Sequence, residues 1–207
     1  MTAPKFRRRS ADRPTEIVAA ALAVFAEKGF AAARLDDIAA RAGVSKGALY
    51  LYYETKEDIF RAVVTQAVAP NIAPIRAAIE TFPGPFGQFI AAFTGMIPAV
   101  LGRSHVGAIA KMIIGESRNF PELARYWHDE VIGPMLAALT AAIGRAQARG
   151  EVRPGDPRLY AVQMAAPFLM ATIWRETFTP IGAEPMDLEI LAKQHFATLS
   201  AGMLVQP

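Results

Sequence analysis

The segment LDDIAARAGVSKGALYLYYETK, residues 35–56, constrains the fold of this chain more than any other stretch of it. It predicts two short helices separated by a turn at Gly43, where a left-handed backbone conformation favours glycine. Ile38 and Leu49 are placed to pack the two helices together, and Ser45 is placed to cap the second helix. This arrangement is typical of a helix-turn-helix, which lays its second helix in the major groove of DNA.

The rest of the chain is also predicted to be helical, because no stretch keeps the strict apolar–polar alternation of a strand. One helix is expected before the motif, at about residues 14–28, and another after it, at about 55–70. Pro70, Pro74 and the FPGPFG stretch at 82–87 are expected to interrupt the chain. Further helices are expected at about residues 86–101, 104–116, 121–148, 157–178 and 187–204.

These signals predict an all-α protein with two domains. A basic tail over residues 1–13 precedes a three-helix helix-turn-helix head at 14–61, and a linking helix leads on to about residue 70. An α-helical bundle is expected at 71–207. The chain has 207 residues, of which 53% are hydrophobic, and this is enough to bury a core.

Charge and cysteine content narrow the class of protein. The net charge of +3 is too small for a protein that coats nucleic acid through bulk charge, and a cluster of basic residues lies in the tail, at Lys5, Arg7, Arg8 and Arg9. The absence of cysteine excludes disulfides and thiolate metal sites, and it suits a reducing cytoplasm.

Two apolar stretches look like targeting or membrane segments, and neither is interpreted as one. Residues 17–26 follow a basic tail, but Glu16 and Glu27 bracket them and the large side chains share one helical face. Residues 81–102 carry no charge, but prolines and glycines leave an apolar helix too short to cross a bilayer comfortably. We therefore predict a cytoplasmic protein without a membrane segment.

The second helix of the motif leaves a set of side chains pointing outwards, Lys46, Gly47, Ala48 and Tyr50. Lysine can reach guanine edges or phosphate, glycine permits close backbone approach, and tyrosine offers a ring and a hydroxyl. Thr55 and Lys56 then open the following helix with free amides and a cation. This combination predicts a phosphate contact.

The segments EIVAAALAVFAEKGF (16–30) and LDDIAARAGVSKGALYLYYETKEDIF (35–60) resemble the N-terminal domain of the TetR/AcrR family of transcriptional regulators. The resemblance implies that Lys56 anchors the DNA backbone and that Tyr53 locks the reading helix onto the head. It also implies a set of major-groove and phosphate contacts, from Ser45, Lys46, Gly47, Ala48, Tyr50 and Tyr52.

Two positions depart from the pattern of that family. Arg34 stands where Thr or Ser usually caps the first motif helix, and arginine cannot accept the capping bond although it can hold phosphate by charge. Ala48 replaces a common Thr, and its methyl group could contact a thymine methyl. Both departures leave DNA binding expected while changing the expected operator sequence.

The second domain contains helices that are apolar nearly all round, at 86–101 and 159–174. Such helices need burial on every side, against another subunit or around a cavity. The resemblance implies both a ligand-binding domain and a dimer formed by its last two long helices. The residues expected in the dimer interface are Ala161, Ala165, Leu188, Leu191, His195, Phe196, Leu199 and Met203.

A ligand pocket is expected to combine aromatic and methionine side chains with a few polar groups. The candidates are Phe89, Phe93, Met96, Met112, Glu116, Tyr126, Phe168 and Trp174. Each of them could equally fill the protein core. Glu116 is the most specific candidate because a carboxylate among apolar residues needs a partner, although Arg118 or Arg125 could supply one.

Catalysis is not expected. His105, His128 and His195 lie far apart, and no pair has the spacing that sets two metal ligands on one helical face. No nucleophile elbow, phosphate-binding glycine loop or cofactor fingerprint is present in the sequence. We therefore predict no cofactor and no metal.

The resulting hypothesis is a homodimeric DNA-binding regulator that reads an inverted repeat and responds to a small apolar or amphipathic effector. The family resemblance implies that it is a repressor released from its operator by that effector. One alternative is a constitutive dimeric DNA-binding protein with no effector. The other is a small-molecule binder or scaffold whose head has lost DNA binding.

Overall fold

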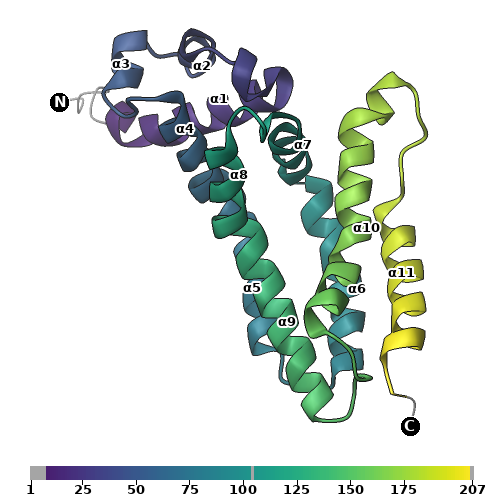
Figure 1. The fold of residues 1–207 in the computed structure, drawn as a ribbon. Helices are drawn as coiled ribbons and strands as arrows, with labels where there is room; N and C mark the ends of the chain where they lie inside the picture. The colour runs from purple at the N-terminus through teal and green to yellow at the C-terminus, as the bar shows by residue number, and fades with distance from the viewer. Residues whose placement is uncertain (1–7, 104, 206–207) are drawn as a thin grey trace, which may run out of the picture. The chain divides into compact units, whose positions relative to one another are not determined.

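The structure of the protein, a computed structural model, describes residues 8–103 and 105–205. Lys5 and Arg7 of the predicted basic tail lie outside these residues. The described part is helical throughout, as predicted, apart from an isolated antiparallel bridge between Val152 and Leu204 (Figure 1). The helices are α1 (Arg8–Ala32), α2 (Leu35–Arg41), α3 (Lys46–Tyr50), α4 (Lys56–Ala62), α5 (Ala69–Thr81), α6 (Phe86–Arg103), α7 (Val106–Glu116), α8 (Pro121–Trp127), α9 (Gly133–Ala148), α10 (Pro157–Thr177) and α11 (Leu188–Met203).

The first helix is longer than predicted and is interrupted near its end. It begins before Pro14, which lies inside the helix rather than in its first turn. Gly29 has φ 76° and ψ 171°, so the chain leaves the helical conformation there before a last turn that ends at Ala32. The expected stop at Gly29 is therefore a break followed by a short joint to α2.

The expected interruption at Pro70 and Pro74 does not occur. A π-helical segment, Val63–Val68, joins α4 to α5, and both prolines lie within α5. Both are exposed, and water can bond the carbonyl groups that a proline leaves without an amide partner. The linking helix therefore continues past residue 70 to Thr81.

The chain forms two compact units, which differ from the predicted division. The head unit contains the described residues up to Pro70 together with Met112–Trp127, and the bundle unit contains Asn71–Lys111 and the chain from His128 onwards. The sequence-based division assigned 112–127 to the second domain. Packing explains the difference, because the Phe120 ring lies 4.9 Å from the Phe30 ring of the head.

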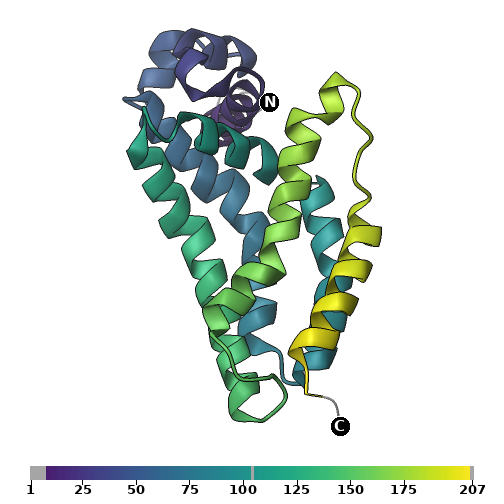
Figure 2. The ribbon, with the colours of Figure 1, turned by 45° about the vertical axis from the view of Figure 1, so that its right-hand side comes forward.

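The bundle unit is built around two helix pairs, α6 with α11 and α9 with α10 (Figures 1 and 2). Its core contains Phe93, Ile143, Phe168 and Phe196, and α5 adds Ile75. Aromatic side chains pack ring to ring, and Phe93 lies 5.8 Å from Phe196 and 5.3 Å from Phe89, between ring centroids. The chain expected to be buried at 86–101 thus supplies one wall of this core.

The helical run Pro121–Ala148, which contains α8, the π-helical segment His128–Ile132 and α9, is long and apolar enough to cross a membrane. Val131, Leu139 and Ile143 are nevertheless buried inside the protein. Length and composition alone are weak support for a span, because core helices pass the same test.

Candidate nucleic-acid interface and apolar cavity

The helix-turn-helix of the head forms as the sequence predicts. Ile38 and Leu49 are fully buried between α2 and α3, and Gly43 takes the left-handed conformation with φ 66°. The Ser45 Oγ accepts a hydrogen bond from the Ala48 amide at 3.2 Å, and this bond caps α3. The two short helices are therefore held at a fixed turn with the first amides of α3 at one end.

The outer face of α3 carries the aromatic side chains that the sequence placed there. Tyr50 is 45% exposed and Tyr52 39%, while Lys46 and Gly47 are also exposed and Ala48 is half-buried. A further side chain on this surface went unnoticed in the sequence. Leu51 is 82% exposed directly after α3, and only its position between two tyrosines could have indicated it.

Lys46 is paired within the head. Its Nζ lies 2.9 Å from the Asp36 carboxylate of α2, and both side chains are more than half exposed. The hydrogen bond to Asp36 raises the pKa of Lys46 above its ordinary value. A carboxylate on this surface repels phosphate, so Asp36 competes with DNA for the lysine.

The N-termini of α4 and α2 are capped in two different ways. Thr55 and Asp58 form a capping box at α4, in which the Thr55 Oγ1 accepts from the Asp58 amide at 3.1 Å and Asp58 accepts from the Thr55 amide at 3.1 Å. At α2 the Arg34 side chain makes no capping hydrogen bond, as predicted. Asp37 accepts from the Arg34 amide at 3.4 Å and pairs with Lys28 at 2.9 Å.

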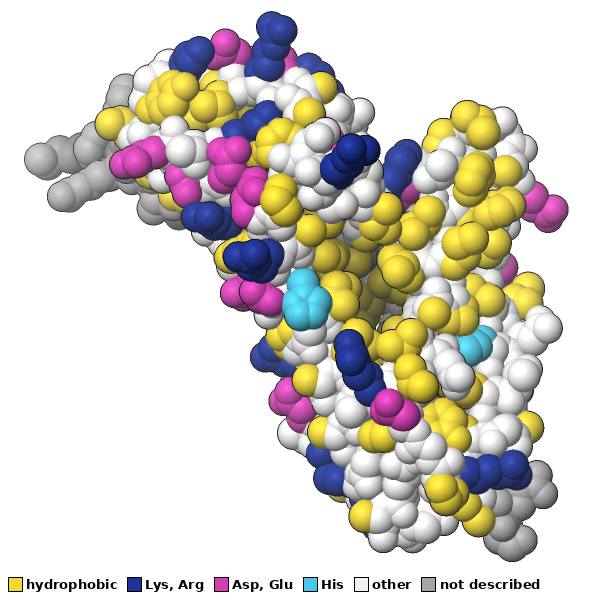
Figure 3. Space-filling model, viewed as in Figure 1, with side chains coloured by type: hydrophobic (Ala, Val, Ile, Leu, Met, Phe, Trp, Pro, Cys, Tyr) yellow, Lys and Arg dark blue, Asp and Glu magenta, His cyan; other side chains and the backbone are white. Residues whose placement is uncertain are grey.

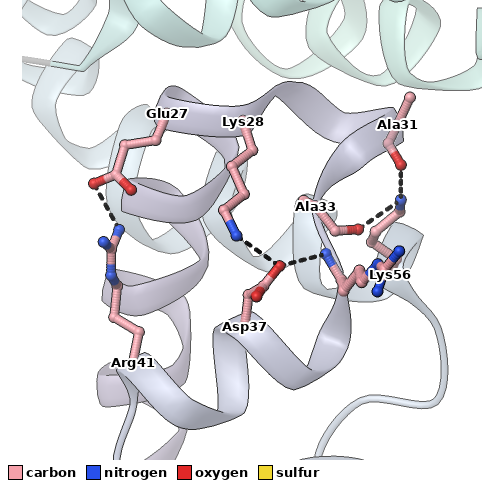
Figure 4. A network of polar contacts seen from close by, with 8 residues as sticks. Glu27, Lys28, Ala31, Ala33, Asp37, Arg41 and Lys56 are labelled. Atoms are coloured by element: carbon pink, nitrogen blue, oxygen red, sulfur yellow. Dashed lines mark hydrogen bonds and ion pairs between the residues drawn. The ribbon is translucent and has the colours of Figure 1, made fainter.

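Lys56 differs from its expected role at the DNA backbone. Its Nζ donates to the carbonyl oxygens of Ala31 and Ala33 at 3.2 and 3.0 Å (Figure 4). It also donates to the Phe30 carbonyl oxygen at 2.6 Å and lies 4.5 Å from the centroid of the Phe30 ring. An ammonium group has three protons, so these three bonds use its whole donor capacity. The lysine that was expected to clamp phosphate instead closes the joint between α1 and α2.

Glu116 contacts the same joint from α7 and is not among the described residues that line the apolar cavity of the bundle unit. Its Oε2 accepts a hydrogen bond from the Ala31 amide at 2.7 Å. Its Oε1 lies 2.5 Å from the position that a Cβ at Gly29 would occupy, so only glycine allows this approach. The partner that the carboxylate needed is therefore a backbone amide freed by the helix break, rather than a ligand or a nearby arginine.

The bundle unit contains an apolar cavity of about 280 Å³ that is partly open to solvent. Its walls come from α5, α6, the first residue of α7, the π-helical segment His128–Ile132 with the start of α9, and α10. The polar side chain among its lining residues is Thr172, and the Thr172 Oγ1 donates to the Leu169 carbonyl at 2.8 Å. The lining residues are Ile72, Ile75, Phe93, Ile97, Val100, Leu101, Val106, Val131, Ile132, Met135, Leu136, Leu139, Val162, Met164, Ala165, Ala166, Phe168, Leu169 and Thr172.

Two of the predicted pocket residues, Phe93 and Phe168, lie on the wall of this cavity. Phe89 and Met96 belong instead to the core and its margin. Met112 and Tyr126 belong to the head unit with Glu116, and the Tyr126 ring lies 5.9 Å from the Arg61 guanidinium. The Trp174 Nε1 donates to the Glu184 carbonyl at 2.9 Å in the turn after α10. Aromatic character alone did not distinguish wall from core, and most wall residues are aliphatic.

Comparison with known proteins matches both units. The family model described as bacterial regulatory proteins, tetR family, matches residues 17–63. The model described as AefR-like transcriptional repressor, C-terminal domain, matches residues 90–201, which is more than half of the chain. The chain belongs to the TetR/AcrR family of transcriptional regulators. The family resemblance seen in the motif is thereby confirmed.

Members of the TetR/AcrR family match this chain over part of its length. RutR of Escherichia coli is 38% identical over 81 residues, which cover 39% of this chain and 38% of RutR. The transcriptional activator FasR of Mycolicibacterium smegmatis is 37% identical over 70 residues, which cover 34% of this chain and 32% of FasR. The matched stretch is thus between about a third and two fifths of these relatives.

Solved structures of TetR-family proteins match over nearly the whole chain. A regulator from Mesorhizobium loti is 26% identical with a TM-score of 0.71, covering 95% of this chain and 99% of that one. FadR of Bacillus subtilis, solved in complex with stearoyl-CoA, has 22% identity and a TM-score of 0.71, covering 91% of this chain and 98% of its own. The second likeness concerns the fold alone.

Five of the eight residues predicted for the dimer interface pack against the core or line the cavity of the same chain. Ala161, Phe196 and Met203 are buried in the core of the same chain, Ala165 lines the cavity, and His195 packs against Phe168. The half-buried residues of the predicted set are Leu188, Leu191 and Leu199. The apolar stripe on α11 is buried because α11 packs along α6, so its burial needs no second subunit.

Proposed function

We propose that this TetR-family protein is a homodimeric, cytoplasmic repressor that leaves a palindromic operator when a small apolar molecule occupies its bundle cavity. The observation that carries the proposal is the combination of an exposed reading helix in one unit with an apolar cavity in the other. Repression is supported by the match to an AefR-like repressor domain over residues 90–201.

The reading surface supports specific DNA recognition. Capped α3 presents Tyr50, Gly47 and Lys46 to solvent, which together offer a hydrogen-bonding ring, close backbone approach and a cation. Arg34, Ser45 and Thr55 lie around it and are exposed for phosphate contact. Ala48 and Tyr52 complete the surface, whereas Lys56 acts on DNA only through the joint that it holds.

A two-fold dimer is supported by the outer faces of the last two helices. Leu159 and Met170 on α10 are 60% and 52% exposed, and Ile190 on α11 is 62% exposed. Figure 3 shows hydrophobic side chains gathered over α10 and the loop after it. A surface of this kind is stable when a second copy covers it, and paired heads then read an inverted repeat.

The cavity supports the role of an effector. A ligand shifts an equilibrium between two states only by the difference between its affinities for them. α7 connects the two sites along one helix, because Val106 lines the cavity and Glu116 contacts the α1–α2 joint. The solved FadR complex with stearoyl-CoA is an example of this fold with an acyl compound bound.

Selection from random-sequence DNA at a stated salt concentration, followed by footprinting, tests the DNA part of the proposal. We expect one palindrome to be protected by the full-length protein. Tyr50→Ala is expected to remove this protection while leaving the melting temperature unchanged, since Tyr50 lies outside the core. No preference over bulk DNA would instead identify a scaffold that has lost DNA binding.

Titration of the same footprint with 1-decanol tests the effector part. Loss of protection on addition of the alcohol supports release by an apolar ligand. Protection that stays constant, while calorimetry shows that the alcohol binds, would identify a constitutive DNA-binding protein.

A further inference from the structure

The cavity in the bundle unit has a wall whose chemistry restricts what it can hold. Among the residues that the structure describes, no residue lining the cavity is charged, and none is Asn, Gln, Tyr, Trp or His. A ligand group inside the cavity therefore finds neither a counter-ion nor an amide side chain. Burying an ionised group without a partner costs several kcal/mol, so such a group either stays outside or prevents binding.

The one hydroxyl among the described lining residues, that of Thr172, is already engaged. The Thr172 Oγ1 donates its proton to the Leu169 carbonyl of the same helix, 2.8 Å away. Only its acceptor lone pairs remain for a ligand, and the side chain is buried. Thr172 is therefore interpreted as part of the packing between α10 and α7, since the Cβ of a residue at Gly107 would lie 3.0 Å from the Thr172 Cβ.

Two cations, Arg175 and Lys111, are also engaged with protein partners. Arg175 donates to the carbonyl of the lining residue Leu101 at 3.0 Å and to the Glu176 carboxylate at 2.9 Å. Lys111 donates to the Glu176 carbonyl. An anionic ligand would have to displace one of these partners, and the Glu176 carboxylate itself opposes its approach.

The volume limits the size of a ligand. At about 280 Å³ the cavity has roughly twice the volume of the ~150 Å³ apolar cavity that holds one benzene molecule, so it suits roughly ten to twelve carbon atoms. Met135 and Met164 on the wall are flexible side chains that can adapt to different hydrocarbon shapes.

We infer that the effector site accepts an uncharged, hydrocarbon-like molecule of about ten to twelve carbons and discriminates against carboxylates and ammonium ions of the same shape. The inference rests on the proposed function for the meaning of the site as an effector site. The predicted selectivity for uncharged ligands depends only on the residues that line the cavity. The affinity of the site comes from the apolar surface that it buries, and its selectivity comes from the absence of partners for charge.

Isothermal titration calorimetry of the full-length protein without DNA tests this inference. The probes are 1-adamantanol, 1-adamantanecarboxylate and 1-adamantylammonium, which are compact enough to lie wholly inside. 1-Decanol repeats the neutral measurement with an elongated shape. We expect at least one neutral probe to bind and both ions to bind at least about 30-fold more weakly, because no group compensates their charge.

Three variants assign the binding to this cavity. Ala165→Phe fills the space from α10 and is expected to weaken binding of the neutral probe at least about tenfold. Ala141→Phe adds the same side chain at an exposed site of α9 and should leave binding unchanged. Thr172→Val should change the affinity less than about twofold, because the hydroxyl is engaged with Leu169.

Several results would overturn the inference: an ion that binds as tightly as the neutral probe and is displaced by Ala165→Phe, neutral binding that Ala165→Phe leaves intact, or no binding by any probe. A melting curve of Ala165→Phe distinguishes a filled cavity from a failed fold, and Leu139→Trp from α9 offers a second filling variant. Failure of the proposed function looks different. In that case the neutral probe binds as expected, but either no palindrome is protected or the protection of the palindrome does not change when the probe is added.

Discussion

At the scale of single residues, the reading surface contains one ion pair that opposes DNA binding. Asp36 holds the Lys46 Nζ at 2.9 Å and places a carboxylate beside the expected path of phosphate. Water screens an exposed pair of this kind, so it adds little to the stability of the head. Its main effect is therefore expected in the complex with DNA.

Asp36→Asn is expected to raise affinity for the selected palindrome about two- to fivefold, because Lys46 is freed and a repulsive charge is removed. The dependence of log affinity on log salt should steepen by about one if the lysine then takes up a phosphate. Footprint titrations at several salt concentrations measure both. Asp129→Asn, an exposed carboxylate of the bundle unit, is the control. A loss of affinity in Asp36→Asn would show that Asp36 itself contacts a base.

His195 gives the protein a pH-dependent stability. Burial holds the pKa of His195 below its ordinary value of 6.5, against weaker opposition from hydrogen bonds to the backbone of Gln163 and Met164. Its Nε2 is buried without a hydrogen-bond partner in the described part of the chain, beside the rings of Phe168 and Phe196. The folded state therefore resists protonation of this ring.

The direction of this pH dependence follows from the linkage between protonation and folding. As pH falls below 6.5 the unfolded chain binds a proton at His195 before the folded chain does, so stability declines until the folded pKa is passed. We expect the melting temperature to fall less between pH 7.5 and pH 5.5 in His195→Phe than in the wild type. His128→Gln removes an exposed histidine and should decline as the wild type does. Parallel curves for all three proteins would contradict this role of His195.

At the scale of elements, the joint between α1 and α2 is held by opposite charges from two different helices. Lys56 of α4 satisfies the carbonyls of the joint, and Glu116 of α7 satisfies an amide freed by the break at Gly29. α2 begins at Leu35, immediately after this joint. The position of α2 and α3 within the head therefore depends on these two side chains.

Lys56→Met is expected to destabilise the protein by about 1–3 kcal/mol, because carbonyl oxygens near the joint lose a charged donor. Thermal unfolding measures this loss, and hydrogen exchange should rise at residues 29–33. Lys28→Met, which removes the exposed pair with Asp37, should cost less than about 1 kcal/mol. If Lys56 instead served only as a phosphate contact, Lys56→Met would lower DNA affinity and leave the melting curve unchanged.

Local signals predicted the elements well and their partners poorly. The Ser45 cap and the Gly43 turn depend on residues within a few positions, and they form as expected. The partner of Glu116 lies 85 residues away in sequence, beyond the reach of any local pattern. The prediction of a break at Pro70 was also wrong, because a π-helical segment before it and its exposure to solvent let the helix continue.

At the scale of the whole molecule, the same limit explains the dimer face. An apolar stripe shows which side of a helix is buried without showing what buries it. The stripe on α11 that includes Phe196 and Met203 is buried by its own chain. The side facing away from the core carries Leu159 and Met170 on α10, with Ile190, Ala197 and Ala201 exposed on α11. Small residues at 197 and 201 allow helices to approach closely, which favours this outer face as the interface.

Met170→Glu is expected to raise the dimer dissociation constant at least about 100-fold, since two-fold symmetry sets the new carboxylates near each other in an apolar contact. Sedimentation equilibrium measures the change, and the melting curve of the monomer should stay cooperative. Met203→Glu places the same charge inside the core and should unfold the chain instead, while Ile114→Glu, on an exposed site of α7, should leave the dimer intact. A Met170→Glu protein that remains dimeric would move the interface off α10. Because a palindrome needs both heads, the monomer should also lose most of its operator affinity while keeping the reading helix folded.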